Sequence, residues 1–257
     1  MDWVHLALTG ALYVGGAVIL ALLGLLIVRR YVSHHVLAPH NDVAGFIYAT
    51  IAVTYAVILG FVTITVWEAY EEARSNADHE ANVVADLYRL ADWFPETDRE
   101  AIQAMLTAYA TSVIEEEWDA MDRGEAPAAS TSDSLDRLWE LYAELDPGAG
   151  GQAVAYSDSM DRLQDLGDAR RMRLLESEVG IPGIMWVGLI AGGAITVAFA
   201  YGFGVERGQS HGVMLATLAA SVALLLFMVS SLNYAFHGDV RVQPDGMELV
   251  LSQFNTG

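Results

Sequence analysis

The residues best suited to chemistry lie along the apolar segment of residues 43–67 and its continuation. Steps of three or four residues join three threonines, two bulky apolar side chains and two carboxylates: Thr50, Thr54, Ile58, Phe61, Thr65, Glu68 and Glu72. On a helix this spacing places all seven side chains on one face, here named the polar stripe. In an oligomer whose copies surround an axis, the polar stripe would line a wetted pore with an apolar constriction and a charged mouth.

The threonines of the polar stripe also have a purely structural interpretation. Threonine hydroxyls in membrane helices commonly donate a hydrogen bond to a carbonyl one turn back in their own helix. The sequence therefore leaves two alternatives open, a pore lining and a set of hydroxyls satisfied within one helix.

Two clusters of polar residues could bind metal ions, but their spacing argues against it. His34, His35 and His40 share a short loop without the spacing of two ligands on one helix. The run from Glu115 to Glu117 could offer oxygen ligands to a hard cation. Consecutive helical carboxylates point in different directions, however, so a solvated face is the expectation. The sequence predicts no metal site.

Sequence patterns of the common enzymes are missing from the chain. It contains no glycine-rich phosphate loop, nucleophile elbow, zinc-protease helix or dinucleotide fingerprint. We therefore expect a protein that is not an enzyme, with no catalytic residues and no cofactor.

Composition and charge restrict the class of protein and its partners. Of 257 residues, 54% are hydrophobic, and 33 acidic side chains outnumber 13 basic ones, all of them arginine, for a net charge of −20. Such a charge repels nucleic acid, which is not an expected partner. The charge is concentrated between Glu68 and Gly180, where 27 acidic residues against 9 arginines give −18. The lack of cysteine excludes disulfides and thiolate metal sites.

Four segments meet the requirement of about 20 apolar residues for a membrane crossing. They are Val4 to Val28, Val43 to Trp67, Ile181 to Phe203 and Val213 to Leu232, and none contains a charged residue in its interior. The N-terminus lacks the basic region of a signal peptide, so we expect its segment to be retained. The prediction is an all-α, multi-pass protein of the cell membrane, with the lipid bilayer as partner and its spans paired in two hairpins.

Between the hairpins the hydrophobic pattern changes to that of amphipathic helices. We expect one helix from Glu68 to Trp93 that continues the second span, another that begins after Pro95 and stops near Gly124, a third from a cap at Ser132 or Asp133, and a fourth from about Ala153 to Glu178. The stretch 124–132 is expected to be a mobile loop, and the tail after Leu232 shows alternation near residues 240–251. The predicted domains are the first hairpin (1–67), an acidic helical bundle (68–180), the second hairpin (181–232) and the tail (233–257).

Two further patterns concern packing and orientation. Gly188 and Gly192 form a GxxxG motif, which predicts close helix packing within one subunit or between subunits. The positive-inside rule compares Arg29, Arg30 and Arg207 with Arg241 and with whichever arginines of the insert are counted. The result reverses with that choice, so charge does not decide which side of the membrane holds the insert.

Several short motifs, in this order along nearly the whole chain, resemble the bestrophin-like family catalogued as domain of unknown function 4239. The resembling residues are Asn41, Gly45, Tyr48, the segment 67–73 (WEAYEEA), Glu80, the pair Glu117 and Trp118, Arg170, Arg173, Leu174, Ile181, Pro182, Trp186, Phe236 and Gly238. The segment from Asn233 to Gly238 (NYAFHG) departs from the family's usual Asp-x-Pro-Phe-x-Gly, since it lacks the aspartate and the proline.

The resemblance implies a bestrophin-like layout: a pentameric channel for chloride and other anions, with paired hairpins, a cytosolic helical insert and a pore lined by the second span. On this plan the polar stripe faces the axis and inorganic ions are the permeating partners. A ring of carboxylates at Glu68 and Glu72 would repel chloride, so selectivity stays open. The alternatives are a non-conducting scaffold or sensor whose insert binds a partner protein and, less favoured because the spans lack an ionisable site, a secondary transporter.

Overall fold

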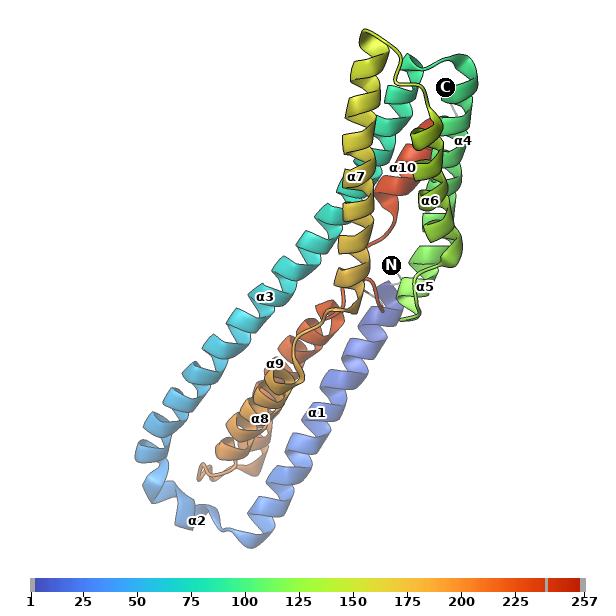
Figure 1. Cartoon of the computed structure of the whole chain (residues 1–257). Helices are drawn as coiled ribbons and strands as arrows, with labels where there is room; N and C mark the ends of the chain where they lie inside the picture. The colour runs from blue at the N-terminus through green and yellow to red at the C-terminus, as the bar shows by residue number, and fades with distance from the viewer. Residues whose placement is uncertain (1–2, 239, 255–257) are drawn as a thin grey trace. The chain divides into compact units, whose positions relative to one another are not determined.

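The structure is a computed structural model that describes residues 3–238 and 240–254, and every regular element among these residues is helical (Figure 1). The α-helices are α1 (Trp3–Tyr31), α2 (His34–Leu37), α3 (Asn41–Leu90), α4 (Glu96–Ser112), α5 (Trp118–Asp122), α6 (Ala129–Glu144), α7 (Gly151–Glu178), α8 (Gly183–Ala200), α9 (Gly208–Leu232) and α10 (Asp245–Phe254). Short 3₁₀ turns cover Ala38–His40 and Ala91–Trp93, and a π-helical turn covers Val113–Glu117.

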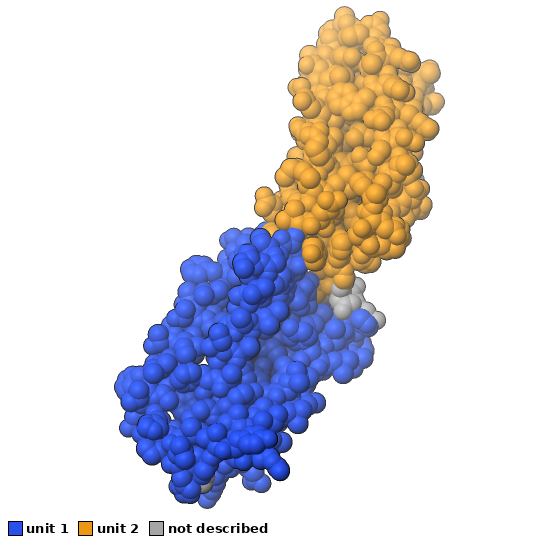
Figure 2. Space-filling view, turned by 60° about the horizontal axis from the view of Figure 1, so that its bottom comes forward, with its two compact units in different colours: residues 1–68, 180–233 blue, residues 69–179, 234–257 orange. Residues whose placement is uncertain are grey.

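The chain divides into two compact units, each with its own core (Figure 2). Unit 1 comprises Met1–Glu68 and Gly180–Asn233, and unit 2 comprises Ala69–Val179 and Tyr234–Gly257. The boundary in the first half of the chain falls inside α3. The segments that form each unit are therefore distant in sequence.

Unit 1 contains the four expected apolar segments, and all four are helical. By length and composition, α1, α8, α9 and the first part of α3 are suited to cross a membrane. This confirms the prediction of an all-helical protein with four apolar spans. Helix α8 is shorter at both ends than the expected segment 181–203, because Pro182 precedes its first turn and a turn follows Ala200.

Side chains of α1 and α9 pack closely in unit 1. Ala21 and Leu25 of α1 form a buried cluster with Leu215 and Ala219 of α9. The outer faces of these helices carry many exposed apolar side chains, which is the distribution expected of helices surrounded by lipid. Unit 1 thus shows the residue distribution of a membrane domain.

Unit 2 is a helical bundle around an apolar core. Leu87 of α3, Ile102 and Leu106 of α4, Leu138 of α6 and Leu163 of α7 are fully buried in one cluster. These positions follow the helical periodicity seen in the sequence, so the amphipathic pattern correctly identified the buried faces.

Helix α6 begins at Ala129, three to four residues before the expected cap at Ser132 or Asp133. Its first turn lies against the bundle: Thr131 is fully buried, and the Ser130 hydroxyl donates a hydrogen bond to Glu116. These contacts stabilise a helical turn at residues 129–132, the last part of the stretch that we expected to be a mobile loop. The expected start of this helix was therefore wrong.

From Tyr234 onward the tail belongs to unit 2, and its described part includes the helix α10. Within α10, Met247 and Val250 are buried, and Phe254 stacks on Tyr88 of α3 with ring centroids 3.7 Å apart. The indole of Trp118 donates a hydrogen bond of 3.0 Å to the Val242 carbonyl. The tail therefore contributes side chains to the bundle core, and part of the stretch that alternates in the sequence is helical.

Candidate pore-lining stripe and buried ionic cluster

The first half of α3 has two different faces. Tyr55, Leu59, Val62 and Val66 are buried in a cluster with residues of α8 and α9, namely Leu189, Leu226 and Val229. At 100° per residue, the centre of the polar stripe lies roughly 110° around the helix from the centre of this buried face. The packing within the chain thus fixes the rotation of α3 about its own axis.

All members of the polar stripe are exposed in the single chain, and Phe61 is 69% exposed. Glu68 and Glu72 continue the exposed face along α3. The structure brings none of the seven side chains into the buried core of its own unit. They are available to another copy of the chain, to lipid or to water.

Two threonines of the polar stripe use their hydroxyl donors within α3. Thr50 donates to the Phe46 carbonyl at 3.2 Å and Thr65 to the Phe61 carbonyl at 3.0 Å. A hydroxyl has one donor and two acceptor lone pairs, so these oxygens present acceptors to their surroundings. Both alternatives raised by the sequence are compatible with this arrangement, because a back-bonded hydroxyl still contacts water.

Glu72 has a second carboxylate close by, which sequence reasoning missed. Glu176 of α7 accepts a hydrogen bond of 2.5 Å from the Asn76 amide, and its other oxygen has no hydrogen-bond partner among the described residues. Burial, and to a smaller extent the negative charge of Glu72, raise the pKa of Glu176, while Asn76 lowers it. Asn76 and Glu176 are 100 positions apart in the sequence, so no local pattern predicted their hydrogen bond.

An ionic cluster of Glu80, Tyr109, Glu117, Arg170 and Arg173 lies inside unit 2. The Arg173 guanidinium bonds both oxygens of Glu80, at 2.6 and 3.0 Å, and one oxygen of Glu117 at 2.7 Å. Arg170 bonds Glu117 at 2.6 and 3.2 Å, and the Tyr109 hydroxyl donates to Glu80 at 2.7 Å. Glu80, Glu117 and Arg173 are fully buried and the Arg170 side chain is 11% exposed, so two positive and two negative charges compensate one another largely away from solvent.

The pKa values in the ionic cluster follow from burial and pairing. Burial alone would lower the pKa of Arg173, but Glu80 and Glu117 outweigh it and hold that pKa above its usual range. Burial, together with the nearby Glu80 carboxylate, raises the pKa of Tyr109 well above its usual value. Arg173 also lies over the Trp118 ring, 4.9 Å from its centroid, a cation–π geometry. The cluster joins α3, α4, the π-helical turn and α7.

The expectation for Glu117 was wrong. The run Glu115 to Glu117 was expected to be a solvated face, and Glu115 and Glu116 are indeed exposed, whereas Glu117 is fully buried. The π-helical turn Val113–Glu117 widens the helix here and is followed directly by buried Trp118. Glu117 is tolerated in the core because Arg170 and Arg173 pair with it.

The two glycines of the GxxxG motif lie in different surroundings. A Cβ atom on Gly192 would lie 2.6 Å from the Tyr55 ring, so this glycine permits α3 and α8 to approach closely. A Cβ on Gly188 would meet no atom of the described residues within 4 Å, and Gly188 is exposed. Only Gly192 is therefore in a close helix contact within the chain.

The described side chains of the histidine loop do not form a metal centre. His35 and His40 are exposed, and the His34 side chain is outside the described residues. Among the described residues, no three or more His, Cys, Asp or Glu side chains are placed to hold a metal ion.

Asn233 stands where the Asp-x-Pro-Phe-x-Gly pattern has aspartate, and its contacts show why an uncharged residue fits this position. Its side-chain oxygen accepts a hydrogen bond of 2.9 Å from the Ile181 backbone N–H, an interaction that needs an acceptor but no charge. Phe236 is buried against Trp118, with ring centroids 5.7 Å apart, and Gly238 has a φ of 82°, which favours glycine. The resembling residues here have structural roles.

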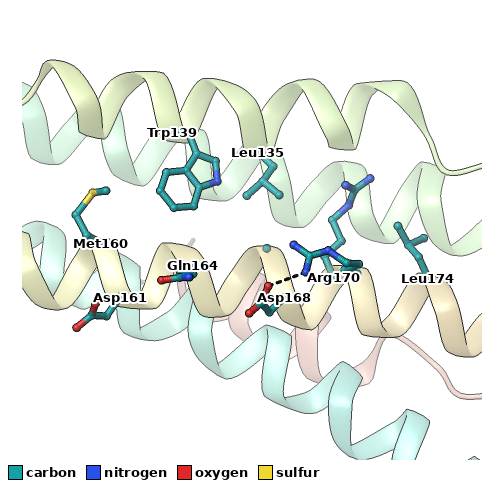
Figure 3. A pocket seen from close by; sticks show the side chains of 10 residues that line it. Leu135, Trp139, Met160, Asp161, Gln164, Asp168, Arg170 and Leu174 are labelled. Carbon is teal, nitrogen blue, oxygen red and sulfur yellow. Dashed lines mark ion pairs between the residues drawn. The ribbon is translucent and has the colours of Figure 1, made fainter.

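A groove of about 620 Å³ lies between α6 and α7 of unit 2 (Figure 3). Trp139 of α6 and Met160 of α7 form apolar walls, and Asp161 and Asp168 add carboxylates from α7. Arg171 pairs with Asp168 at 3.0 Å. The groove combines apolar and charged groups on the surface of the acidic bundle.

Comparison with known proteins gives a family and a fold. A family model of the bestrophin-like domain matches residues 15–247. Two structures of a bacterial bestrophin homologue from Klebsiella pneumoniae, each with a single substitution, match this chain with a TM-score of 0.71 and 12% identity. Both matches cover 95% of this chain, and they cover 99% and 98% of the two homologue chains. A third, solved by Zn-SAD phasing, has a TM-score of 0.64 and 14% identity over 93% of this chain and 97% of its own.

At such identities the structures establish the fold alone, and comparison with curated proteins gives no match. The apolar spans and the bestrophin-like fold identify a membrane protein. Because the family model extends over most of the sequence, the chain belongs to the bestrophin-like family.

Proposed function

We propose that the protein is a homo-oligomeric ion channel with the polar stripe of α3 as its pore lining. The observation that carries the proposal is the exposure of the whole stripe on a span whose adjacent face is packed against α8 and α9. Hydroxyls and carboxylates on such a face are accommodated best by a shared aqueous axis, where water solvates them. Membership of the bestrophin-like family supports this function.

The proposed channel has the bestrophin-like layout. Its four spans form two hairpins, residues 1–67 and 181–232, in the cell membrane, and five copies surround the axis. The acidic bundle, residues 68–180, lies on the cytosolic side together with the tail, residues 233–257. In this arrangement Phe61 and Ile58 form the apolar constriction, and Gly188 is placed for contact between subunits.

The chemistry of the stripe favours cations over anions. The back-bonded hydroxyls of Thr50 and Thr65 offer oxygen lone pairs, and Glu68 and Glu72 add negative charge at one end. Oxygen acceptors and carboxylate rings stabilise cations and repel anions. We therefore propose that the channel prefers small cations such as sodium.

Ion flux through the purified protein in liposomes tests this proposal. With a sodium chloride gradient, the reversal potential should lie toward that of sodium. Replacing Glu68 and Glu72 together by glutamine should move it toward zero, whereas Glu71→Gln, at a neighbouring position outside the stripe, should leave it unchanged. Absence of ion flux at any pH, salt concentration or voltage would refute the channel.

A second candidate function is a non-conducting scaffold whose helical insert binds a partner protein. The groove between Trp139 and Met160 is the observation that favours it, since it exposes aromatic and thioether surface beside charges. Single-particle imaging separates the two functions. A symmetric ring with Thr54 and Phe61 on its axis supports the channel, and a monomer or dimer with the stripe covered supports the scaffold.

A further inference from the structure

Glu176, near the C-terminal end of α7, has a partly buried carboxyl group whose two oxygens are treated differently. Its Oε1 atom accepts the hydrogen bond from the Asn76 amide of α3, at 2.5 Å. Its Oε2 atom is buried and has no hydrogen-bond partner among the described residues. Solvent does not reach this oxygen, so neither bulk water nor a dissolved metal ion contacts it. A proton is the ligand that needs no further space there.

Two fully buried carboxylates of unit 2, Glu80 and Glu117, show what a permanent negative charge requires inside this bundle. Each receives charge-assisted hydrogen bonds from arginine, and Arg173, three residues before Glu176 on α7, is bonded to both. Among the described residues no ion pair joins Glu176 to an arginine. A charge on Glu176 is therefore uncompensated, and a poorly solvated charge without a partner is costly. The neutral, protonated carboxyl group avoids this cost.

The groups around Glu176 also favour the protonated form. Burial is the largest cause of its raised pKa, and the negative charge of Glu72 raises that pKa further, whereas the hydrogen bond from Asn76 lowers it. Glu72 is the charged group of α3 that acts on this carboxyl group, one helical turn before Asn76. The charges of α7 within one turn are Arg173, which is paired elsewhere, and Glu178, which is exposed. The balance places the pKa of Glu176 above its ordinary value of 4.5.

We propose that Glu176 is a proton-binding switch between α3 and α7. With the proton bound, the neutral carboxyl group keeps its partly buried position and its hydrogen bond from Asn76. When the proton passes to water, a second negative charge is left near Glu72, on a group with one oxygen that solvent does not reach. The carboxylate then turns outward to be solvated, and the C-terminal turn of α7 is released from α3.

Infrared spectroscopy of the full-length protein in liposomes detects the proton directly. A protonated carboxyl group has a C=O stretching band that a carboxylate lacks. The wild-type spectrum minus that of Glu176→Gln isolates this band from those of the other acidic residues, since glutamine has nearly the same size and cannot ionise. We expect the difference band to disappear as the pH is raised, with a midpoint above 4.5 that reports the raised pKa of Glu176. A difference spectrum without this band at every pH above 4.5 would overturn the proposal.

Two substitutions on α3 should move the infrared midpoint in opposite directions. Glu72→Gln removes a negative charge that favours the proton, so the midpoint should fall. Asn76→Leu removes the donor that favours the charged form, so the midpoint should rise. Glu178→Gln, which neutralises an exposed carboxyl group two residues away on α7, is the matched control and should leave the midpoint unchanged. Equal midpoints in all three variants would contradict the assigned surroundings of Glu176.

A nitroxide spin label tests the movement that follows loss of the proton. The chain contains no cysteine, so Val179→Cys provides a single attachment site, and Val179 is 66% exposed and directly follows α7. We expect the label to become more mobile as the pH is raised through the infrared midpoint, and to show no such change when Glu176→Gln is also present. A pH-independent mobility in the protein with native Glu176 would show that the proton is bound without a switch.

One consequence rests on the proposed channel function. Glu72 belongs to the polar stripe, so loss of the proton from Glu176 adds negative charge near the charged end of the proposed pore. In a sodium chloride gradient, the reversal potential should therefore move further toward that of sodium as the pH is raised, in the wild type but not in Glu176→Gln. A conducting protein without this pH dependence would contradict the link to the pore. Absence of all ion flux would refute the channel alone, because the infrared and spin-label results do not depend on conduction.

Discussion

Replacing Arg173 by methionine should destabilise unit 2 strongly, because it removes the positive charge that compensates buried Glu80. The variant loses three charge-assisted hydrogen bonds, of 2.6 and 3.0 Å to Glu80 and 2.7 Å to Glu117. Glu117 keeps Arg170, whereas Glu80 keeps only the Tyr109 hydroxyl as a side-chain donor among the described residues. Breaking a buried pair in this way costs about 3–5 kcal/mol.

Removing Glu80 at the same time should recover much of this loss. In the double variant Arg173→Met with Glu80→Leu, both unpaired charges are gone and the Arg170–Glu117 pair remains. The residual cost should be about 1–2 kcal/mol, which includes the Tyr109 hydroxyl left without its acceptor. The effects of the two single substitutions should therefore be far from additive.

Hydrogen exchange of the purified protein, followed by mass spectrometry of α7 peptides, measures the effect locally. A loss of 3 kcal/mol corresponds to a decrease in protection of about a hundredfold. Arg171→Met is the matched control, since Arg171 is 69% exposed and its surface pair with Asp168 is worth less than about 1 kcal/mol. Wild-type protection in Arg173→Met, or additive effects in the double variant, would refute the reasoning.

Two further predictions concern the stripe and Glu176. Phe61→Ala should raise ion leak through the liposome-reconstituted protein, because it widens the proposed constriction. Thr9→Ala on α1 is the control and should have little effect. Unchanged leak in a folded Phe61→Ala variant would contradict the assignment of Phe61 as the constriction. The raised pKa of Glu176 means that the folded state holds its proton more tightly, so this contribution to stability is present at low pH and lost as pH rises through the raised pKa. Thermal unfolding of Glu176→Gln should show less loss of stability over that range than the wild type, and identical pH profiles would contradict the assignment.

The sequence predicted the elements whose signals are local. The four apolar segments and the buried stripe of α4, from Ile102 to Tyr109, follow directly from hydropathy and helical period. The helix of the tail carries a similar signal beside the alternation, because Met247, Val250, Leu251 and Phe254 recur at helical spacing.

The features that were missed depend on contacts between distant residues. Burial of Glu117 requires Arg170, 53 residues away, and Arg173, 56 residues away, and no local pattern reveals these partners. The early start of α6 depends in the same way on burial of Thr131 and on the contact of Ser130 with Glu116. The positions of the polar stripe are exposed in the chain, so their role depends on whatever surrounds α3, which the sequence does not specify.

The members of the ionic cluster are far apart in the sequence, and this determines the order in which they become available during synthesis. Glu80 and Glu117 leave the ribosome 93 and 56 residues before Arg173. Until then α3 and α4 carry carboxylates that cannot enter an apolar interior, because an uncompensated charge there is too costly. The acidic bundle can therefore close only after α7 has been synthesised, so folding of the bundle core is a late step. Until then the carboxylates of Glu80 and Glu117 must stay solvated by water.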